Sequence, residues 1–289
     1  MKAEVEALKA RLHAPIFALL CEWDEHEPPG LYHYTTTLNF RKILSSKVLW
    51  STDVLKMNDS TEFLYAQKLV HLILQGKWQR LPVSVSDSFN PRRGPVGLGD
   101  VWRIYAACFC TRNDQLGQWW RYADAAMGVA LQFDYGALSE YSERTKRFAI
   151  IPMRYGAIQL IDAVEFIAEL GLALSDESDL SFEAAEQFWP EVCLRILNTA
   201  IHFKHPVYAE EREWRVLSIC ETSEPCSTRI SSGELTHFLE LPIIETSLRR
   251  VIVGPRASNA TQRELTHLLI GCGLDHVEVV PAAIPIRNY

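Results

Sequence analysis

Phe203-Lys-His-Pro-Val-Tyr-Ala-Glu-Glu-Arg-Glu-Trp-Arg-Val-Leu217 is the stretch around which the chain is organised, because a charged cluster runs directly into an apolar segment. This change from charged to apolar residues predicts a strand from Glu213 to Ile219, with Glu211 just before its first residue. Side chains two apart in a strand share a face, so Glu211 and Glu213 are expected to point the same way.

Two acids on one face have two interpretations. Carboxylates that close together repel each other unless a partner uses them. Such a pair can carry acid–base chemistry or stabilise a cation. The alternative is a solvated start of a strand, where Glu–Arg pairs each contribute little to stability. The stretch alone leaves both interpretations open.

Length and composition indicate an ordinary globular protein. The 289 residues are 48% hydrophobic and 22% charged, which is enough apolar material for one large domain or two small ones. The net charge of −7 argues against a broad phosphate-binding surface. Any contact with nucleic acid would need a local basic patch.

The spacing of the cysteines and the lengths of the apolar segments predict where the protein is located and whether it binds a metal. Seven cysteines without a framework spacing are typical of a reducing compartment. Cys108 and Cys110 form one close pair, but no partner follows at zinc-ligand spacing, so we expect no metal. There is no signal-peptide pattern and no apolar run of membrane-spanning length. We therefore expect a cytoplasmic protein without a membrane partner.

Hydrophobic periodicity predicts helices at the start, middle and end of the chain. Helices are expected over residues 2–23, over 38–45 after a Thr36 or Thr37 cap, in two pieces over 157–204, and over 260–272. Short strands are predicted at residues 31–35, 48–52, 104–111, 128–133, 148–155, 213–220, 237–241, 250–254 and 277–280.

This order of elements favours an α+β fold with a mostly antiparallel sheet and flanking helices over a regular βαβ wind. We interpret residues 1–289 as a single α+β domain. Residues 1–27 would form an N-terminal helix, and residues 157–204 a helical insertion on the sheet.

Few residues outside the acidic stretch could carry chemistry. His33 stands in a strand between two tyrosines, where it could be a packed side chain or could bind a ribose hydroxyl or a phosphate. Trp119 and Tyr122 could stack a planar ring, although aromatic clusters beside a strand are also typical of a core. The sequence contains no Gly-rich phosphate loop, no Gly-x-Ser-x-Gly elbow and no metal-binding pair of histidines.

Several short motifs, taken in order, resemble the bacterial domain-of-unknown-function family 2971 (DUF2971). The resemblance spans residues 31–257. It rests on Tyr32-His-Tyr34, Leu49-Trp-Ser51, Met57-Asn-Asp59, Ala107-Cys-Phe109, Gln118-Trp119, Tyr122-Ala-Asp124, Gly128-Val-Ala-Leu-Gln-Phe-Asp134, Glu211-x-Glu213-Trp-Arg215 and Val251-Ile-Val-Gly-Pro255.

More distantly, Tyr32-His-Tyr-Thr35 followed by a helix and a short strand resembles the ADP-ribosyltransferase superfamily. In that superfamily a His or Arg on a first strand binds NAD, and a Ser or Thr on a second strand supports the nicotinamide ribose. A Glu on a later strand holds the ribose 2′-hydroxyl. The resemblance implies a split β-sandwich and NAD as the substrate.

By position, the resemblance implies that His33 is the first-strand residue and that Glu213 is the catalytic acid. Ser51 or Thr52 would be the middle residue, although they do not form a complete Ser-Thr-Ser motif. Glu211 would match the additional glutamate that activates the acceptor in some members, and the two acids could exchange roles. The residues expected to contact NAD are His33, Tyr34, Thr35, Ser51, Thr52, Asn58, Trp119 and Tyr122.

The expected function is that of an NAD-dependent ADP-ribosyltransferase-like protein. A fixed carboxylate stabilises the oxocarbenium-like state through which an N-glycosidic bond breaks. Such a protein would be a candidate bacterial toxin or phage-defence effector that modifies a protein or nucleic acid, with an antitoxin as a candidate partner.

Two other hypotheses stay open. The first is a non-catalytic module that binds a nucleotide or a protein on the same scaffold, with residues 157–204 as an interaction surface. The second is a metal-dependent nuclease or other hydrolase that would use Asp59, Glu62, Glu211 and Glu213.

Overall fold

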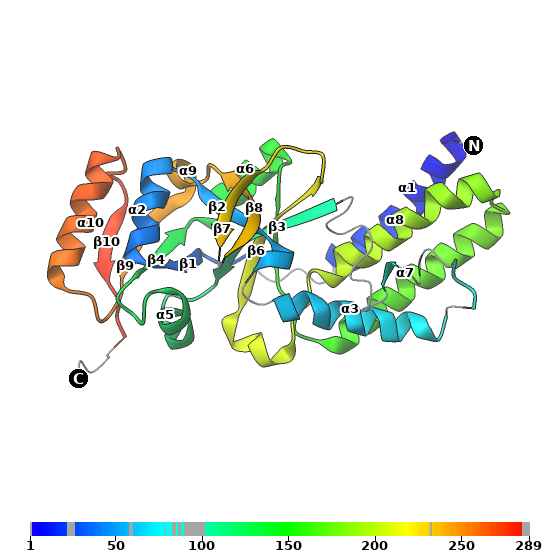
Figure 1. Cartoon of the computed structure of the whole chain (residues 1–289), viewed down its shortest axis with the longest axis horizontal. Coiled ribbons are helices and arrows are strands. Elements are labelled where there is room, and N and C mark those ends of the chain that lie inside the picture. Colours follow the sequence, from blue (N-terminus) through cyan, green and yellow to red (C-terminus); the bar gives the residue numbers. More distant parts are fainter. Residues whose placement is uncertain are drawn as a thin grey trace.

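The structure is a computed structural model that describes residues 2–21, 27–57, 60–77, 79–82, 85, 88–89, 102–231 and 233–284. Within these residues the predicted α+β fold is confirmed, with a mostly antiparallel open sheet and flanking helices (Figure 1). The sheet and its helices form one half of the elongated molecule, and a bundle of helices forms the other half.

The ten described strands form one hydrogen-bonded sheet, in which only β9 and β10 pair in parallel. The strand order is β10-β9-β4-β1-β3-β2-β8-β7, with β6 paired to β3 and β5 paired to β6. The bounds are β1 Leu31–Thr35, β2 Leu49–Asp53, β3 Trp102–Cys110, β4 Val129–Phe133, β5 Ala149–Pro152, β6 Glu213–Glu221, β7 Ser227–Ser231, β8 Glu234–Leu241, β9 Leu248–Val253 and β10 Glu278–Pro281. Each predicted strand is present. The sequence does not predict β7, because Ser-Thr-Arg-Ile-Ser contains a single apolar residue.

The sheet branches at β3. One edge of this strand pairs with β6 over its whole length, Trp102–Cys110. The other edge pairs with β2 at Tyr105 and Ala106, and with β1 only at Cys110. Among the described strands, none pairs with residues 107–109 on that second edge, so a gap opens between β1 and β2. The strands thus form one branched sheet, whereas the distant resemblance implies a split β-sandwich.

Four helices bury a first hydrophobic core against one face of the sheet: α2 (Thr37–Ser46), α6 (Tyr135–Thr145), α9 (Ile244–Ser247) and α10 (Asn259–Gly271). The predicted Thr36 cap of α2 is confirmed, because its side chain accepts a hydrogen bond from the Asn39 N–H at 3.1 Å. The sequence pattern does not predict α6. Its start is marked by Asp134, whose side chain accepts a hydrogen bond from the Ala137 N–H at 2.7 Å.

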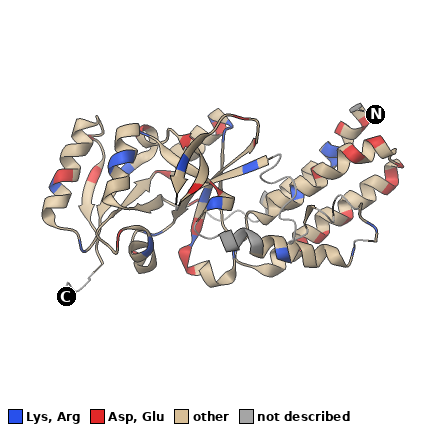
Figure 2. Ribbon diagram, in the orientation of Figure 1, with Lys and Arg blue, Asp and Glu red and all other residues tan. Residues whose placement is uncertain are grey.

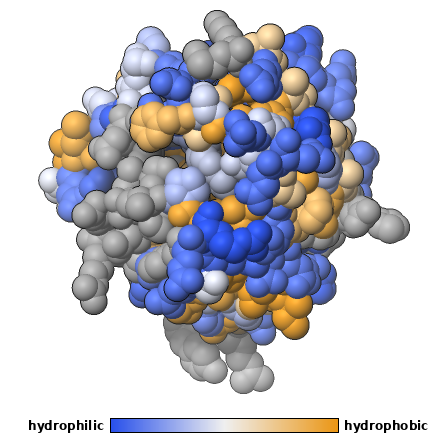
Figure 3. Space-filling view, turned by 90° about the vertical axis from the view of Figure 1, so that its right-hand side faces the viewer, coloured by the Kyte–Doolittle hydropathy of each residue, from blue (hydrophilic) through white to orange (hydrophobic). Residues whose placement is uncertain are grey.

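A second hydrophobic core lies inside a bundle of helices, α1 (Lys2–Cys21), α3 (Ser60–Gln75), α7 (Ala157–Ser178) and α8 (Phe182–Ala200). The predicted helical block over 157–204 therefore consists of α7 and α8, and the N-terminal helix packs against both. Hydrophilic and hydrophobic residues are interspersed on the free end of the bundle (Figure 3). None of the described helices is both long and apolar enough to cross a membrane.

Candidate functional site

A cavity of about 250 Å³ lies where the gap in the sheet meets the end of the helical bundle. Its walls come from β1, β2, β3, β6 and β7, from the 3-10 helix η1 (Val54–Lys56), from α5 (Leu116–Tyr122) and from the chain that follows α8. Acidic and basic residues lie next to one another in this region (Figure 2). The predicted site residues that line the cavity are His33, Tyr34, Thr52, Tyr122, Glu211 and Glu213.

One face of the sheet forms the floor of this cavity. The strand register places Cys108 opposite Arg215, and Ala106 opposite Thr52. Directly paired residues and residues two apart in a strand share a face. These side chains therefore project toward the cavity together with Glu213, which precedes Arg215 by two positions.

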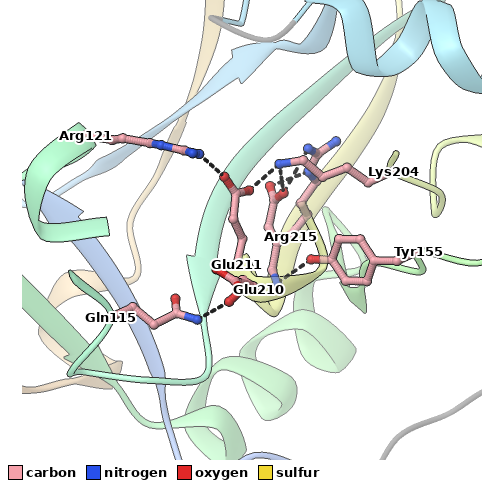
Figure 4. A network of polar contacts seen from close by, with 8 residues as sticks. Gln115, Arg121, Tyr155, Lys204, Glu210, Glu211 and Arg215 are labelled. Carbon is pink, nitrogen blue, oxygen red and sulfur yellow. Dashed lines mark hydrogen bonds and ion pairs between the residues drawn. The ribbon is translucent and has the colours of Figure 1, made fainter. Parts of the chain in front are cut away.

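The two glutamates converge on one lysine (Figure 4). Glu211 ends the 3-10 helix η2 (Pro206–Glu211), and Glu213 begins β6. The Lys204 Nζ lies 2.8 Å from the Glu213 Oε2 and also forms an ion pair with Glu211. Between the two acids, Arg212 has a left-handed backbone (φ 45°), which costs a residue other than glycine roughly 1–2 kcal/mol. The two carboxylates share a side as predicted, but this turn, and not strand alternation alone, brings them together.

Glu213 is a buried carboxylate, with 5% of the residue exposed. Its Oε1 lies 2.6 Å from the Arg215 Nε, and its Oε2 lies 3.2 Å from the Arg215 Nη2. The Cys108 thiol also donates a hydrogen bond to it. Burial by itself would raise the pKa of Glu213, but the charges of Arg215 and Lys204 outweigh burial and lower the pKa to about 2. The interpretation of this stretch as a solvated start of a strand is therefore wrong.

Glu211 occupies the outer position of the pair. Its Oε1 lies 2.8 Å from the Nη1 of Arg121 on α5, and the Arg121 side chain is 58% exposed. Gln115 donates a hydrogen bond to the carbonyl oxygen of Glu210, and the first amide of β6 donates to the Tyr155 Oη at 2.8 Å (Figure 4). These contacts fasten the acidic turn to α5 on one side and to the segment after β5 on the other.

His33 lies on β1 beside the gap in the sheet. Its Nδ1 is 2.9 Å from the carbonyl oxygen of Cys108, in the part of β3 that lacks a strand partner on this edge. Because a carbonyl oxygen only accepts, Nδ1 carries the proton and donates it. Burial lowers the pKa of His33 more than this hydrogen bond raises it, so the ring is neutral near pH 7. Its Nε2 is then an acceptor.

Tyr34 and Tyr122 supply aromatic walls. The Tyr34 hydroxyl donates to the carbonyl oxygen of Arg112 at 2.9 Å, and its ring packs edge to face against Trp119 with centroids 4.9 Å apart. Burial, assisted by the charge of Glu211, raises the pKa of Tyr122 to about 12. The phenol of Tyr122 is therefore neutral near pH 7 and keeps its O–H as a donor.

The structure places two of the predicted ligand contacts, on β1 and β2, outside the cavity lining. Ser51 is fully buried and does not line the cavity, because alternation along β2 turns Trp50 and Thr52 toward the cavity and Ser51 away from it. Thr35, at the end of β1, is 6% exposed and also lies outside the cavity lining.

Trp119 likewise lies outside the cavity lining. The inner side of α5 packs against the sheet, so Trp119 is fully buried in a small aromatic and aliphatic cluster with Tyr34. Asn58 lies outside the described residues. So does Asp59, and the side chain of Glu62 is likewise not described. Of the four acids in the metal-dependent hypothesis, the structure therefore places Glu211 and Glu213, and both form ion pairs with Lys204.

Sequence reasoning missed four cationic side chains of the described cavity lining: Lys56, Lys204, Arg215 and Arg229. Arg215 carried a usable signal, because its spacing of two from Glu213 puts both on one strand face. Lys204 stands in the same stretch, but only the folded turn directs it at both acids. Arg229 comes from β7, the strand that the sequence does not predict.

Residues 118–216 match the family model described as "Protein of unknown function (DUF2971)". The match runs from α5 into the first residues of β6 and contains both glutamates, and it supports the predicted DUF2971 family. It adds no support for the resemblance to ADP-ribosyltransferases. No curated protein matches the chain, and no solved structure does.

Proposed function

We propose that this protein cleaves the N-glycosidic bond of NAD and transfers ADP-ribose to a macromolecular acceptor, a protein or a nucleic acid. One observation carries the proposal. A neutral imidazole, His33, and an acidic pair, Glu211 and Glu213, come from distant parts of the chain and line one cavity. Functional sites are where such groups gather in a concave, partly apolar setting.

The chemistry assigns a role to each group. The bond between ribose and nicotinamide breaks, and its electron pair leaves on neutral nicotinamide while positive charge develops on the ribose. Glu211, the less buried acid, would face this charge and stabilise it. The acceptor then forms a bond to the same carbon and releases a proton. The Nε2 of His33 would accept a hydrogen bond from a ribose hydroxyl.

Glu213 would act as a positioning residue. Its two oxygens are held by Arg215 and Lys204. Through Lys204 it fixes the direction of the Glu211 carboxylate, which shares the same Nζ. Preorganised charges of this kind need no rearrangement when the transition state forms.

The size of the cavity limits what it can enclose. Ligand pockets usually measure about 300–1,000 Å³. A cavity of about 250 Å³ would surround the nicotinamide riboside half of NAD and leave the adenosine half outside.

Nicotinamide release from NAD by the purified protein, with water or a supplied macromolecule as acceptor, tests the proposal. The wild type is expected to release nicotinamide, and Glu211→Gln to release it ~100-fold more slowly, the usual cost of losing one transition-state partner. His33→Gln, which keeps a side-chain donor for the Cys108 carbonyl oxygen, is expected to lose activity mainly through weaker substrate binding. Glu245→Gln, on α9 and outside the cavity, is the matched control.

Thermal denaturation identifies variants that fail to fold and so keeps the comparison fair. The proposal is overturned if the wild type releases no nicotinamide, or if Glu211→Gln, still folded, releases it at the wild-type rate.

A second function is favoured by the state of both glutamates. Because the oxygens of Glu213 are paired with Lys204 and Arg215, and those of Glu211 with Lys204 and Arg121, the site could be a non-catalytic module that binds a nucleotide. This alternative predicts that NAD raises the melting temperature while nicotinamide release stays absent in every variant.

A further inference from the structure

Arg229 lines the cavity from the edge strand β7. In the strand order this strand lies at the opposite end of the cavity from the acidic pair. Its guanidinium carbon lies 5.0 Å from the ring centroid of Trp50 and 5.8 Å from that of Phe238. Its Nη2 donates to the Thr52 Oγ1 at 3.1 Å. Stacking on aromatic rings fixes the plane of a guanidinium group and leaves its N–H groups free to bind.

Among the residues that the structure describes, the positive charge of Arg229 has no acidic partner. Within the described ranges, no carboxylate lies within ion-pair distance of it, and its buried Nε lacks a hydrogen-bond acceptor. An arginine stays charged in proteins, and a partly buried charge without a partner is costly. A ligand that supplied anionic oxygens would relieve this cost.

The rest of the lining does not neutralise this end of the cavity. Lys204 and Arg215 are paired with the two glutamates. Lys56 also lines the cavity, and its Nζ lies 2.6 Å from Glu234, in a pair whose side chains are 42% and 67% exposed. Exposed pairs of this kind are weak and exchange readily with other partners. The cavity therefore has a neutralised end at the glutamates and an electropositive end at Arg229.

We propose that Arg229, supported by Thr52 and Trp50, binds the diphosphate group of a nucleotide ligand. The inference rests on the proposed function, which makes a dinucleotide the natural ligand and places its diphosphate beside the enclosed riboside. A planar guanidinium group matches two phosphate oxygens at once, and such charge-assisted hydrogen bonds are strong.

Isothermal titration calorimetry with ADP, adenosine and inorganic pyrophosphate tests this site without any turnover. The wild type is expected to bind ADP more tightly than adenosine. Arg229→Gln should weaken ADP binding ~10- to 100-fold, the range for one or two charged hydrogen bonds, and should leave adenosine binding unchanged. Arg229→Lys keeps the charge and should retain part of the affinity.

Arg250→Gln, which removes an arginine paired with Glu278 on the outer strands, is the matched control and should bind ADP as the wild type does. Pyrophosphate binding that is lost in Arg229→Gln would show that the diphosphate alone is recognised. Unchanged ADP affinity in folded Arg229→Gln, an equal loss for adenosine, or no binding of ADP and pyrophosphate by the wild type would each overturn the site. Absent nicotinamide release together with Arg229-dependent ADP binding would instead remove only the proposed function.

Discussion

Replacing Glu213 by Gln should flatten the dependence of stability on acid pH. The folded protein holds the pKa of Glu213 at about 2, well below its ordinary value of 4.5. The folded state therefore binds fewer protons than the unfolded state between these two values. The stabilisation from Glu213 is complete above pH 4.5 and is lost as the pH falls toward 2.

The magnitude follows from the size of the shift. Each pKa unit corresponds to about 1.4 kcal/mol of differential interaction, so a shift of this size contributes on the order of 3 kcal/mol to the free energy of unfolding at neutral pH. The side chain is almost fully buried, so salt should screen little of it. Gln at this position cannot ionise, and this part of the pH dependence should disappear.

Urea denaturation from about pH 3 to pH 6 measures the effect as the slope of the unfolding free energy against pH. Glu169→Gln is the control, because the pKa of Glu169 is lowered by a hydrogen bond from Lys77 in an exposed setting, and its smaller effect should fade in salt. If the slope of Glu213→Gln equals that of the wild type, the carboxylate is not held ionised by Lys204 and Arg215, and the reasoning fails.

The remaining predictions concern the packing around the site. Lys204→Met should lower the free energy of unfolding by about 3 kcal/mol. This value is near the low end for breaking a buried ion pair, because each acid keeps an arginine partner. The surface variant Lys47→Met should leave the urea midpoint unchanged, and equal midpoints for the two variants would contradict the prediction. Gly254→Ala should destabilise the protein by about 3 kcal/mol, since a Cβ would lie 2.3 Å from the carbonyl oxygen of Ala126. Gly117→Ala in α5 meets no atom within 4 Å and should be neutral or stabilising by up to about 1 kcal/mol in the same denaturation assay.

Local sequence patterns were sufficient for most of the fold. Apolar runs and turn residues locate the predicted strands, and the cap at Thr36 locates α2, because these signals lie within a few residues of the element they determine. Helix α6 could not be predicted because its cap residue, Asp134, directly follows a strand and can equally mark the end of that strand. Helices α7 and α8 could be predicted, but their packing against α1 and α3 depends on contacts between residues distant in sequence.

The candidate site could be predicted only in part, for the same reason. Strand alternation was enough to place Glu213 on a face with a neighbour two residues away. It could not decide between Ser51 and Thr52, because that choice depends on which face of β2 meets the cavity. Lys204 and Arg229 belong to the site through a turn and an edge strand that only the three-dimensional structure reveals.

A crystal structure with a non-hydrolysable NAD analogue tests the central claim most directly. The nicotinamide ribose is predicted to lie within hydrogen-bond distance of the Glu211 carboxylate and the His33 Nε2, with the diphosphate at Arg229. An analogue bound elsewhere on the protein, or a diphosphate that avoids Arg229 while the cavity stays empty, would contradict it.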